Sequence, residues 1–401
     1  MTRVWLAATF GAVIAFAMGA AACDSSEAET PAPDVDGGAD ADASLDANRP
    51  NDEEDAGPDA GELVRCTADD FCHTVLPDGQ VLRGVWGDDQ GVVWAVSEQG
   101  NILRWDGTTW KIRHSNAGPL FGIWGSSATD IWAVGTIGLL HGQGASSDDL
   151  TWTAVPVPGL DGVPLRAIAG RTATDIWAVG GRSNTDVFPP EIEGRVLHFS
   201  GPSSEPGAGW TAESAADMTT LETVWTTAQG DVWIGGTFAE NPWVQLYRGV
   251  LLHRPPGADT FSEVSLPVLD RGGGPTHVQT MTGGATISGD VIVLGVVDHA
   301  GAYLRGNDDP DGGSSLVWEE TTFRVQPSHL HAVWGPSSSD VWLAGDFGRL
   351  RHWDGTSWSL PRIVVGKVPV TNAFYAVWAR AADDLWFVGD RIALHKRPST
   401  K

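Results

Sequence analysis

One sequence unit recurs seven times after residue 81, and this repetition constrains the fold more than any other feature. Each copy begins with a run of the type Leu-x-x-Val-Trp-Gly, continues through a polar turn and then reads Asp-Val-Trp-Ala-Val-Gly, as in 120–135 and 330–345. The repeat region, 66–401, gives about 48 residues per copy. That period is typical of a four-stranded propeller blade and is too long for leucine-rich, ankyrin or tetratricopeptide units.

Each unit reads as four short strands, a to d, because apolar runs of strand length alternate with Gly- and Asp-containing turns. We find no stretch of ten residues with helical periodicity in 66–401. The sequence therefore predicts an all-β fold, a seven-bladed β-propeller. The predicted blades are about 82–118, 119–161, 162–217, 218–273, 274–327, 328–369 and 370–401 plus 71–77.

The last unit lacks its own strand d, and the segment 71–77 before the first unit has the apolar content to replace it. We expect this N-terminal strand to complete blade seven and close the ring, which leaves no exposed sheet edge. The 20 Trp support this register, because 18 of them fall at repeated strand positions where neighbouring blades cover both faces of a sheet. Only Trp5 and Trp243 lie outside the pattern.

The first 65 residues predict export and a tether. Residues 1–22 carry Arg3, an uncharged stretch and small residues, which is typical of a signal peptide; a retained membrane anchor is the alternative. Residues 23–65 contain 14 acidic and two basic residues with few large apolar side chains, so we expect a disordered, extended tether. The net charge of −26 argues against nucleic acid and anionic bilayers as partners.

Ala20-Ala21-Ala22-Cys23 resembles the lipobox of bacterial lipoproteins, although Ala stands where Leu is usual three residues before the Cys. The resemblance implies lipid attachment at Cys23, and cleavage near Ala22 without lipidation is the alternative. The expected location is the bacterial cell envelope, with the domain in the periplasm or at the cell surface and the lipid as its only membrane contact. In an oxidising compartment, Cys66 and Cys72 are expected to form a disulfide rather than remain two buried thiols.

Strand c carries a second repeated position that could suggest a metal or anion ring. It is occupied by Arg104, His141, His198, His253, Arg305, His352 and His395. Equivalent positions in different blades lie too far apart to converge on one ion. Strand b offers a partner within each blade, namely Asp130, Asp175, Asp231, Asp290, Asp340 and Asp384, with Val92 in blade one. We therefore expect an Asp that caps a turn or pairs with its own blade's His, and we predict no metal site and no cofactor.

The b–c loops of blades three and four are enlarged, at 182–193 and 238–248, and neighbouring blades place them on one rim. Aromatic groups beside carboxylates and cations are what a protein hot spot or a sugar site uses. The predicted ligand-binding rim consists of Arg182, Phe188, Glu191, Glu240, Trp243, Tyr247 and Arg248. Alternatively, Trp243 folds back to cover its own loop.

The stretch 92–110 resembles tectonin repeats, which form propeller lectins, and WDGTTW (105–110) and WDGTSW (353–358) resemble shortened Asp-boxes. As a whole, 66–401 is most similar to uncharacterised bacterial lipoproteins with VWG, DVWAVG and WDG repeats behind an Asp/Ala-rich tether.

No nucleophile, zinc or phosphate-loop motif is present, so we predict a non-catalytic protein-binding or scaffold module. The expected partner is an envelope or extracellular protein, and the expected state is a monomer. A tectonin-type lectin with a glycan ligand and, last, a polysaccharide hydrolase are the alternative functions.

Overall fold

The computed structural model describes residues 66–67, 69–201, 209–308, 315–321, 323, 326–365 and 368–397. All of them belong to one compact unit, 59–401. The predicted signal peptide (1–22), tether (23–65) and lipid-attachment residue Cys23 lie outside the described residues. In the described part of the chain, no helix has the length and hydrophobicity needed to cross a bilayer.

The described chain forms seven four-stranded antiparallel sheets, one for each repeat. Blade one holds β2 (Leu82–Gly87), β3 (Val93–Ser97), β4 (Ile102–Trp105) and β5 (Trp110–His114). Blade two holds β6 (Leu120–Ser127), β7 (Asp130–Gly135), β8 (Gly138–Gly144) and β9 (Leu150–Val155). Blade three holds β10 (Leu165–Thr172), β11 (Asp175–Asn184), β12 (Glu191–Phe199) and β13 (Trp210–Ser214).

Blade four holds β14 (Thr219–Thr226), β15 (Val232–Asn241), β16 (Leu246–Arg254) and β17 (Ser262–Glu263). Blade five holds β20 (Thr280–Ile287), β21 (Asp290–Val297), β22 (Ala300–Asp308) and β23 (Leu316–Glu320). Blade six holds β24 (Leu330–Ser337), β25 (Asp340–Gly345), β26 (Leu350–Trp353) and β27 (Trp358–Ser359). Blade seven holds β30 (Phe374–Ala381), β31 (Asp384–Gly389), β32 (Ile392–Lys396) and β1 (Phe71–His73).

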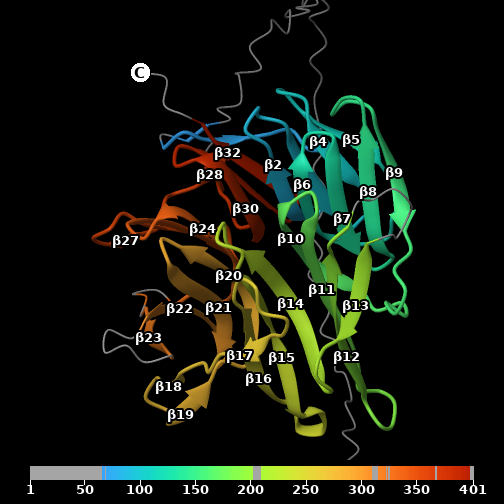
Figure 1. The fold of residues 1–401 in the computed structure, drawn as a ribbon. Coiled ribbons are helices and arrows are strands. Elements are labelled where there is room, and N and C mark those ends of the chain that lie inside the picture. Colours follow the sequence, from blue (N-terminus) through green and yellow to red (C-terminus); the bar gives the residue numbers. More distant parts are fainter. Residues whose placement is uncertain are drawn as a thin grey trace, which may run out of the picture. The chain divides into compact units, whose positions relative to one another are not determined.

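The first strand of each repeat, strand a, lies innermost. Each inner strand contacts the inner strand of the next blade, and β30 of blade seven contacts β2 of blade one, so the ring is closed (Figure 1). The predicted seven-bladed propeller is thereby confirmed. Two small hairpins lie outside the blades, β18 (Val268–Asp270) with β19 (Pro275–His277) and β28 (Val364–Val365) with β29 (Val368–Pro369). A single 3-10 turn, η1 (Pro242–Val244), is the only helical element among the described residues.

The predicted ring closure is also confirmed. Strand β1 pairs antiparallel with β32, with Phe71 opposite Lys396 and His73 opposite Leu394. The Phe71 side chain is buried and contacts the rings of Trp342 and Phe387. The predicted disulfide joins Cys66 to Cys72 at the start of the described chain.

The strand register assigns the connections to two faces. Leu82 at the start of β2 pairs with Ser97 at the end of β3. In blades two and three the start of strand a likewise pairs with the second half of strand b. The d–a and b–c connections therefore share one face, which we call the b–c face. The a–b and c–d connections share the opposite face, which we call the a–b face.

Inner-strand Trp and Gly residues interlock between blades. A Cβ on Gly125 would lie 2.7 Å from the Trp86 ring of the preceding blade, and one on Gly87 would lie 2.6 Å from the Trp378 ring. Gly170 faces Trp124 at the same close range. Such separations are shorter than any side-chain carbon can adopt, so these glycines are required for the indole rings to pack.

The strand-b Trp residues make a second interlock. At five of the seven interfaces the strand-b Trp meets an aromatic ring in or next to the next blade's strand d, edge to face, at 5.3–5.8 Å between ring centroids. These pairs are Trp94–Trp152, Trp132–Trp210, Trp177–Phe261, Trp342–Phe71 and Trp386–Trp110. Edge-to-face contacts are a favoured aromatic geometry, and the same contact recurs between neighbouring blades around the ring.

The expected pairing of strand-c His with strand-b Asp within one blade is confirmed. Asp130 Oδ1 lies 2.6 Å from His141 Nε2, and the same pair recurs in blade seven, where Asp384 Oδ1 lies 2.7 Å from His395 Nε2. Each His ring also stacks on the Trp beside it, at 3.6 Å between centroids for Trp132 and His141. The remaining pairs are His198–Asp175, His253–Asp231, His352–Asp340 and Arg305–Asp290.

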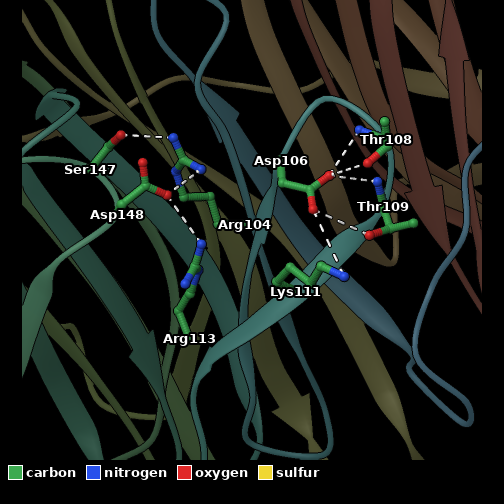
Figure 2. A network of polar contacts seen from close by, with 8 residues as sticks. All are labelled: Arg104, Asp106, Thr108, Thr109, Lys111, Arg113, Ser147 and Asp148. Atoms are coloured by element: carbon green, nitrogen blue, oxygen red, sulfur yellow. Dashed lines mark hydrogen bonds and ion pairs between the residues drawn. The ribbon is translucent and has the colours of Figure 1, made fainter.

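Blade one replaces this pair with a contact between blades. Because Val92 stands where the other blades have Asp, the Arg104 guanidinium instead bonds Ser147 at 2.8 Å and Asp148 at 2.8 Å, both in blade two (Figure 2). In the nearby WDGTTW turn, Asp106 accepts hydrogen bonds from the backbone N–H groups of Thr108 and Thr109, which lower the pKa of its carboxyl. The Asp-box-like motif is thus an Asp that closes its own turn.

The partly buried His residues of strand c predict acid sensitivity. Burial lowers the pKa of His395 and of His198 below 6.5, the usual value for this side chain. Below about pH 6.5 the unfolded chain then binds more protons than the folded chain, so this part of the stability is present above that pH and is lost as the pH falls. We expect a lower melting temperature at pH 5.5 than at pH 7.5, and a smaller decrease in His395→Gln. His277→Gln, at an exposed His, is the control; an equal decrease in all three proteins would contradict the assignment.

Candidate functional site

A cavity of about 890 Å³ lies at the centre of the ring on the b–c face. Its wall is formed by the second residue of the repeated strand-a motif, contributed once by every blade. These seven residues, the mouth ring, are Arg83, Phe121, Arg166, Glu222, Thr282, His331 and Tyr375. Side chains alternate between the two faces of a strand, and this explains the placement. The first residue of each motif is buried between blades, so the second residue points away from that contact and towards the cavity.

The mouth ring was missed by sequence reasoning, although a signal existed. The flanking positions of strand a repeat in most copies, as in Leu-x-x-Val-Trp-Gly, whereas this one position holds a different residue type in nearly every copy. A side chain that varies inside an otherwise repeated strand is not needed for packing between blades. Such a position is free to serve binding.

Arg83 is held against an aromatic ring and a carboxylate. Its guanidinium lies 3.8 Å from the centroid of the Tyr375 ring, and its Nε donates to Glu98 Oε1 at 2.6 Å. The His331 ring also contacts Tyr375, edge to face, at 5.1 Å between ring centroids. His331 Nε2 lies 2.9 Å from Asp346 Oδ1. Blades six, seven and one therefore form one connected polar and aromatic wall.

Arg166 has the same aromatic support but no comparable hydrogen bond. Its guanidinium lies 4.6 Å from the centroid of the Phe121 ring, and its nearest carboxylate oxygen, on Glu222, is 3.9 Å away. The Nε atom is buried and makes no hydrogen bond to any described residue. Although 37% of the Glu222 side chain is accessible, its partial burial in the cavity wall removes water from the carboxyl and raises its pKa. Arg166 thus presents a cation whose hydrogen-bonding capacity is unused.

The enlarged segments of blades three and four differ from expectation, because most of their residues are strand rather than loop. Strands β11 and β12 stay paired out to Asn184 and Glu191, and β15 and β16 stay paired out to Asn241 and Leu246. Paired backbone continues because alternate residues still pack across the hairpin, with Arg182 bonded to Glu193. Figure 1 shows both hairpins extending from adjacent blades.

The hairpin tips bring two of the predicted rim residues together. Phe188 and Trp243 stack at 5.9 Å between ring centroids, with 88% and 56% of their surfaces exposed. Trp243 therefore pairs with the neighbouring blade instead of covering its own loop. The exposed tips also carry Val244, so an apolar patch crosses the boundary between the two blades.

The other predicted rim residues lie along the hairpins rather than at the tips. Arg248 pairs with Glu240 at 3.7 Å and with Glu263 at 2.5 Å, which occupies its charge within blade four. Tyr247 pairs opposite Ala239 in the ladder, and Glu191 opens β12 with an exposed side chain. The structure therefore divides the predicted rim into an aromatic tip, the ion-paired Arg182, Arg248 and Glu240, and the exposed Glu191.

Comparison with known proteins identifies the fold. No protein-family model matches the chain, and no curated protein matches it. A solved structure of YCF48 bound to D1 peptide is 16% identical, with a TM-score of 0.56 over 84% of this chain and 100% of that one. The extracellular domain of the one-component system BT4673 from B. thetaiotaomicron is 14% identical, with a TM-score of 0.57 over 82% of this chain and 40% of that one.

Virginiamycin B lyase from Staphylococcus aureus is also similar, with 12% identity and a TM-score of 0.51 over 81% of this chain and 98% of that one. A peptide-bound protein, an extracellular domain of a one-component system and an enzyme therefore share this fold. At such identities the likeness shows the β-propeller alone, and function has to be argued from the site.

Proposed function

We propose that the protein is a non-catalytic binding module that holds a segment of a partner protein on its b–c face. The segment would lie over the central cavity and reach the aromatic tips of the hairpins. This face combines charged donors fixed against aromatic rings with an exposed apolar patch, which is the composition of protein-binding hot spots.

The observation that carries the proposal is the state of Arg166. The Arg166 guanidinium stacks on Phe121 and donates no hydrogen bond to any described residue. Because 38% of its side chain is accessible, its outer N–H groups can donate to an acceptor that a partner brings. Carboxylates and backbone carbonyls are the acceptors that a polypeptide offers, and Arg binds both in a directional manner. The cavity of about 890 Å³ is large enough for a few residues of an extended chain.

The similar structures support this proposal in kind. One of them is bound to a peptide and another is an extracellular domain of a one-component system. We further propose that the chain is exported and held at the bacterial cell envelope by a lipid on Cys23, as its N-terminal sequence indicates. The acidic segment 23–65 would then give the domain reach from the membrane.

Affinity capture from cell-envelope extract with the full chain tests the proposal. Arg166→Ala is expected to weaken capture of the partner at least tenfold, because a desolvated charged contact is lost on the bound side. Arg113→Ala is the matched control: it removes a cation on the outer strand β5, away from the cavity, and is expected to retain binding. Melting temperatures of the three proteins establish that folding is unaffected.

Equal capture by all three proteins would contradict a role of the cavity. Trp243→Ala provides a second arm, since its exposed ring can be removed without opening the core. A glycan array with the same proteins separates the alternative function. Sugar binding that Trp243→Ala abolishes, without any captured protein, would replace our proposal by the lectin prediction.

A further inference from the structure

The edge-to-face aromatic contact that joins five pairs of blades is missing between blades four and five. Trp233 occupies the strand-b position in blade four, and Trp318 is the central residue of β23, which is strand d of blade five. No ring contact joins them within the described residues. Instead, both line a groove of about 1130 Å³. The remaining interface, between blades five and six, has Ile292 instead of Trp in the strand-b position. Among the described residues, Trp233 is therefore the one strand-b Trp without an edge-to-face aromatic partner in the next blade.

The chain path explains the groove. Strand β17 pairs with only two residues of β16, and the chain leaves the sheet after Val264, whose N–H donates to the Leu251 carbonyl. Trp318 Nε1 donates to the backbone carbonyl of Ser265 at 2.9 Å, which fixes this indole against the departing segment. The groove then opens beside the a–b turns of the two blades, on the face opposite the mouth ring.

The geometry around Trp233 defines what the groove can accept. One face of its indole stacks on Trp225 at 6.1 Å between centroids, and the other stacks on His253 at 3.8 Å. Trp233 belongs to the buried core and only 6% of its surface is exposed, so only a part of its ring edge, facing the groove, is left for a further contact. At five other interfaces that edge or its equivalent meets an aromatic ring, so an aromatic side chain is the occupant that this position is shaped to take.

The charge of the groove indicates the charge of the segment that it can bind. Its described lining includes Asp231, Glu263 and Asp308 but no Lys or Arg. Asp231 is engaged by His253 and Glu263 by Arg248, so acceptor oxygens with remaining lone pairs surround the opening. Segments 24–65 and 309–314 of this chain contain no Phe, Trp or Tyr and offer no ring to fill it.

We propose that this groove is a second docking site, which takes up an aromatic side chain from a basic segment of another polypeptide. The aromatic ring packs against the edge of Trp233, and Lys or Arg beside it faces the acidic lining. Together with the site on the b–c face, which does not depend on it, this would let one domain connect two partners.

Indole NMR of the full chain labelled with ¹⁵N-Trp tests the groove directly. The probe is the tripeptide N-acetyl-Lys-Trp-Lys-amide, and the matched control is N-acetyl-Lys-Ala-Lys-amide. Trp233→Phe and Trp318→Phe assign the two indole signals. We expect saturable shifts of both signals with the Trp peptide, and at least tenfold weaker binding of the Ala peptide.

A groove-filling variant gives the second readout. Ser265→Trp places a large side chain at an exposed lining position and is expected to abolish the shifts, whereas Ser146→Trp, at an exposed turn of blade two, retains them. Equal shifts with both peptides would overturn the aromatic site in favour of charge attraction alone. Absence of shifts at Trp233 and Trp318 would also overturn it. The two peptides need no variant, so the test stays decisive even if Ser265→Trp does not fold.

Discussion

Deleting residues 66–77 is expected to lower the melting temperature of the full chain by roughly 10 °C, with loss of cooperativity in blade seven. The deletion removes Phe71, whose buried ring contacts Trp342 and Phe387, and truncation of such a ring alone costs about 3–5 kcal/mol. It also removes Thr74, whose hydroxyl donates to the Ala393 carbonyl at 2.9 Å and accepts from Trp110 Nε1 at 3.0 Å. Strand β32 would then become an open edge.

Thermal unfolding followed by circular dichroism measures this effect. The matched control deletes 50–61, a stretch of equal length outside the described fold, and is expected to melt at the temperature of the intact protein. Phe71→Ala should give an intermediate decrease. An unchanged melting temperature after removal of 66–77 would refute the role of the N-terminal strand.

The second large effect is expected from Gly125→Ala. The added methyl group would lie 2.7 Å from the Trp86 ring and force the indole or the inner strand to move. Overpacking of this kind costs about 1–3 kcal/mol, and the rigid position between two inner strands favours the upper end. Chemical denaturation of the full chain measures the change in the free energy of unfolding.

Gly273→Ala is the control for this prediction, because a Cβ there meets no atom within 4 Å and the backbone does not require Gly. Its free energy of unfolding should equal or slightly exceed that of the original protein. Equal stability of Gly125→Ala and Gly273→Ala would show that the Trp–Gly interlock does not set the blade spacing.

Much of the fold could be predicted because most of the residues that pack between blades recur in each repeat. The Trp and His of strands b and c recur in four other copies, in blade seven at the same spacing as Trp132 and His141, so the strand register and the Asp130–His141 pair could be expected from the pattern. The missing last strand likewise pointed to 71–77, since this apolar segment stands directly before the first repeat and belongs to none of the seven copies.

The candidate site could not be predicted to the same extent, because it depends on contacts that no single repeat encodes. The stacking of Phe188 on Trp243 joins two insertions of unrelated sequence. The support of Arg166 by Phe121 joins residues 45 positions apart whose shared feature is only their place in strand a. Strand extension in the two hairpins was missed because polar residues there read as loop, although pairing across the hairpin satisfies their backbone.

The pairing of β1 with β32 also determines when the domain can finish folding. Phe71 and Lys396 are neighbours in one sheet although almost the whole domain separates them along the chain. Blades one to six can each form from contiguous sequence as it emerges from the ribosome. Blade seven must wait until β32 has been synthesised, and until then β1 has no partner strand. Closure of the ring therefore follows the formation of the other blades.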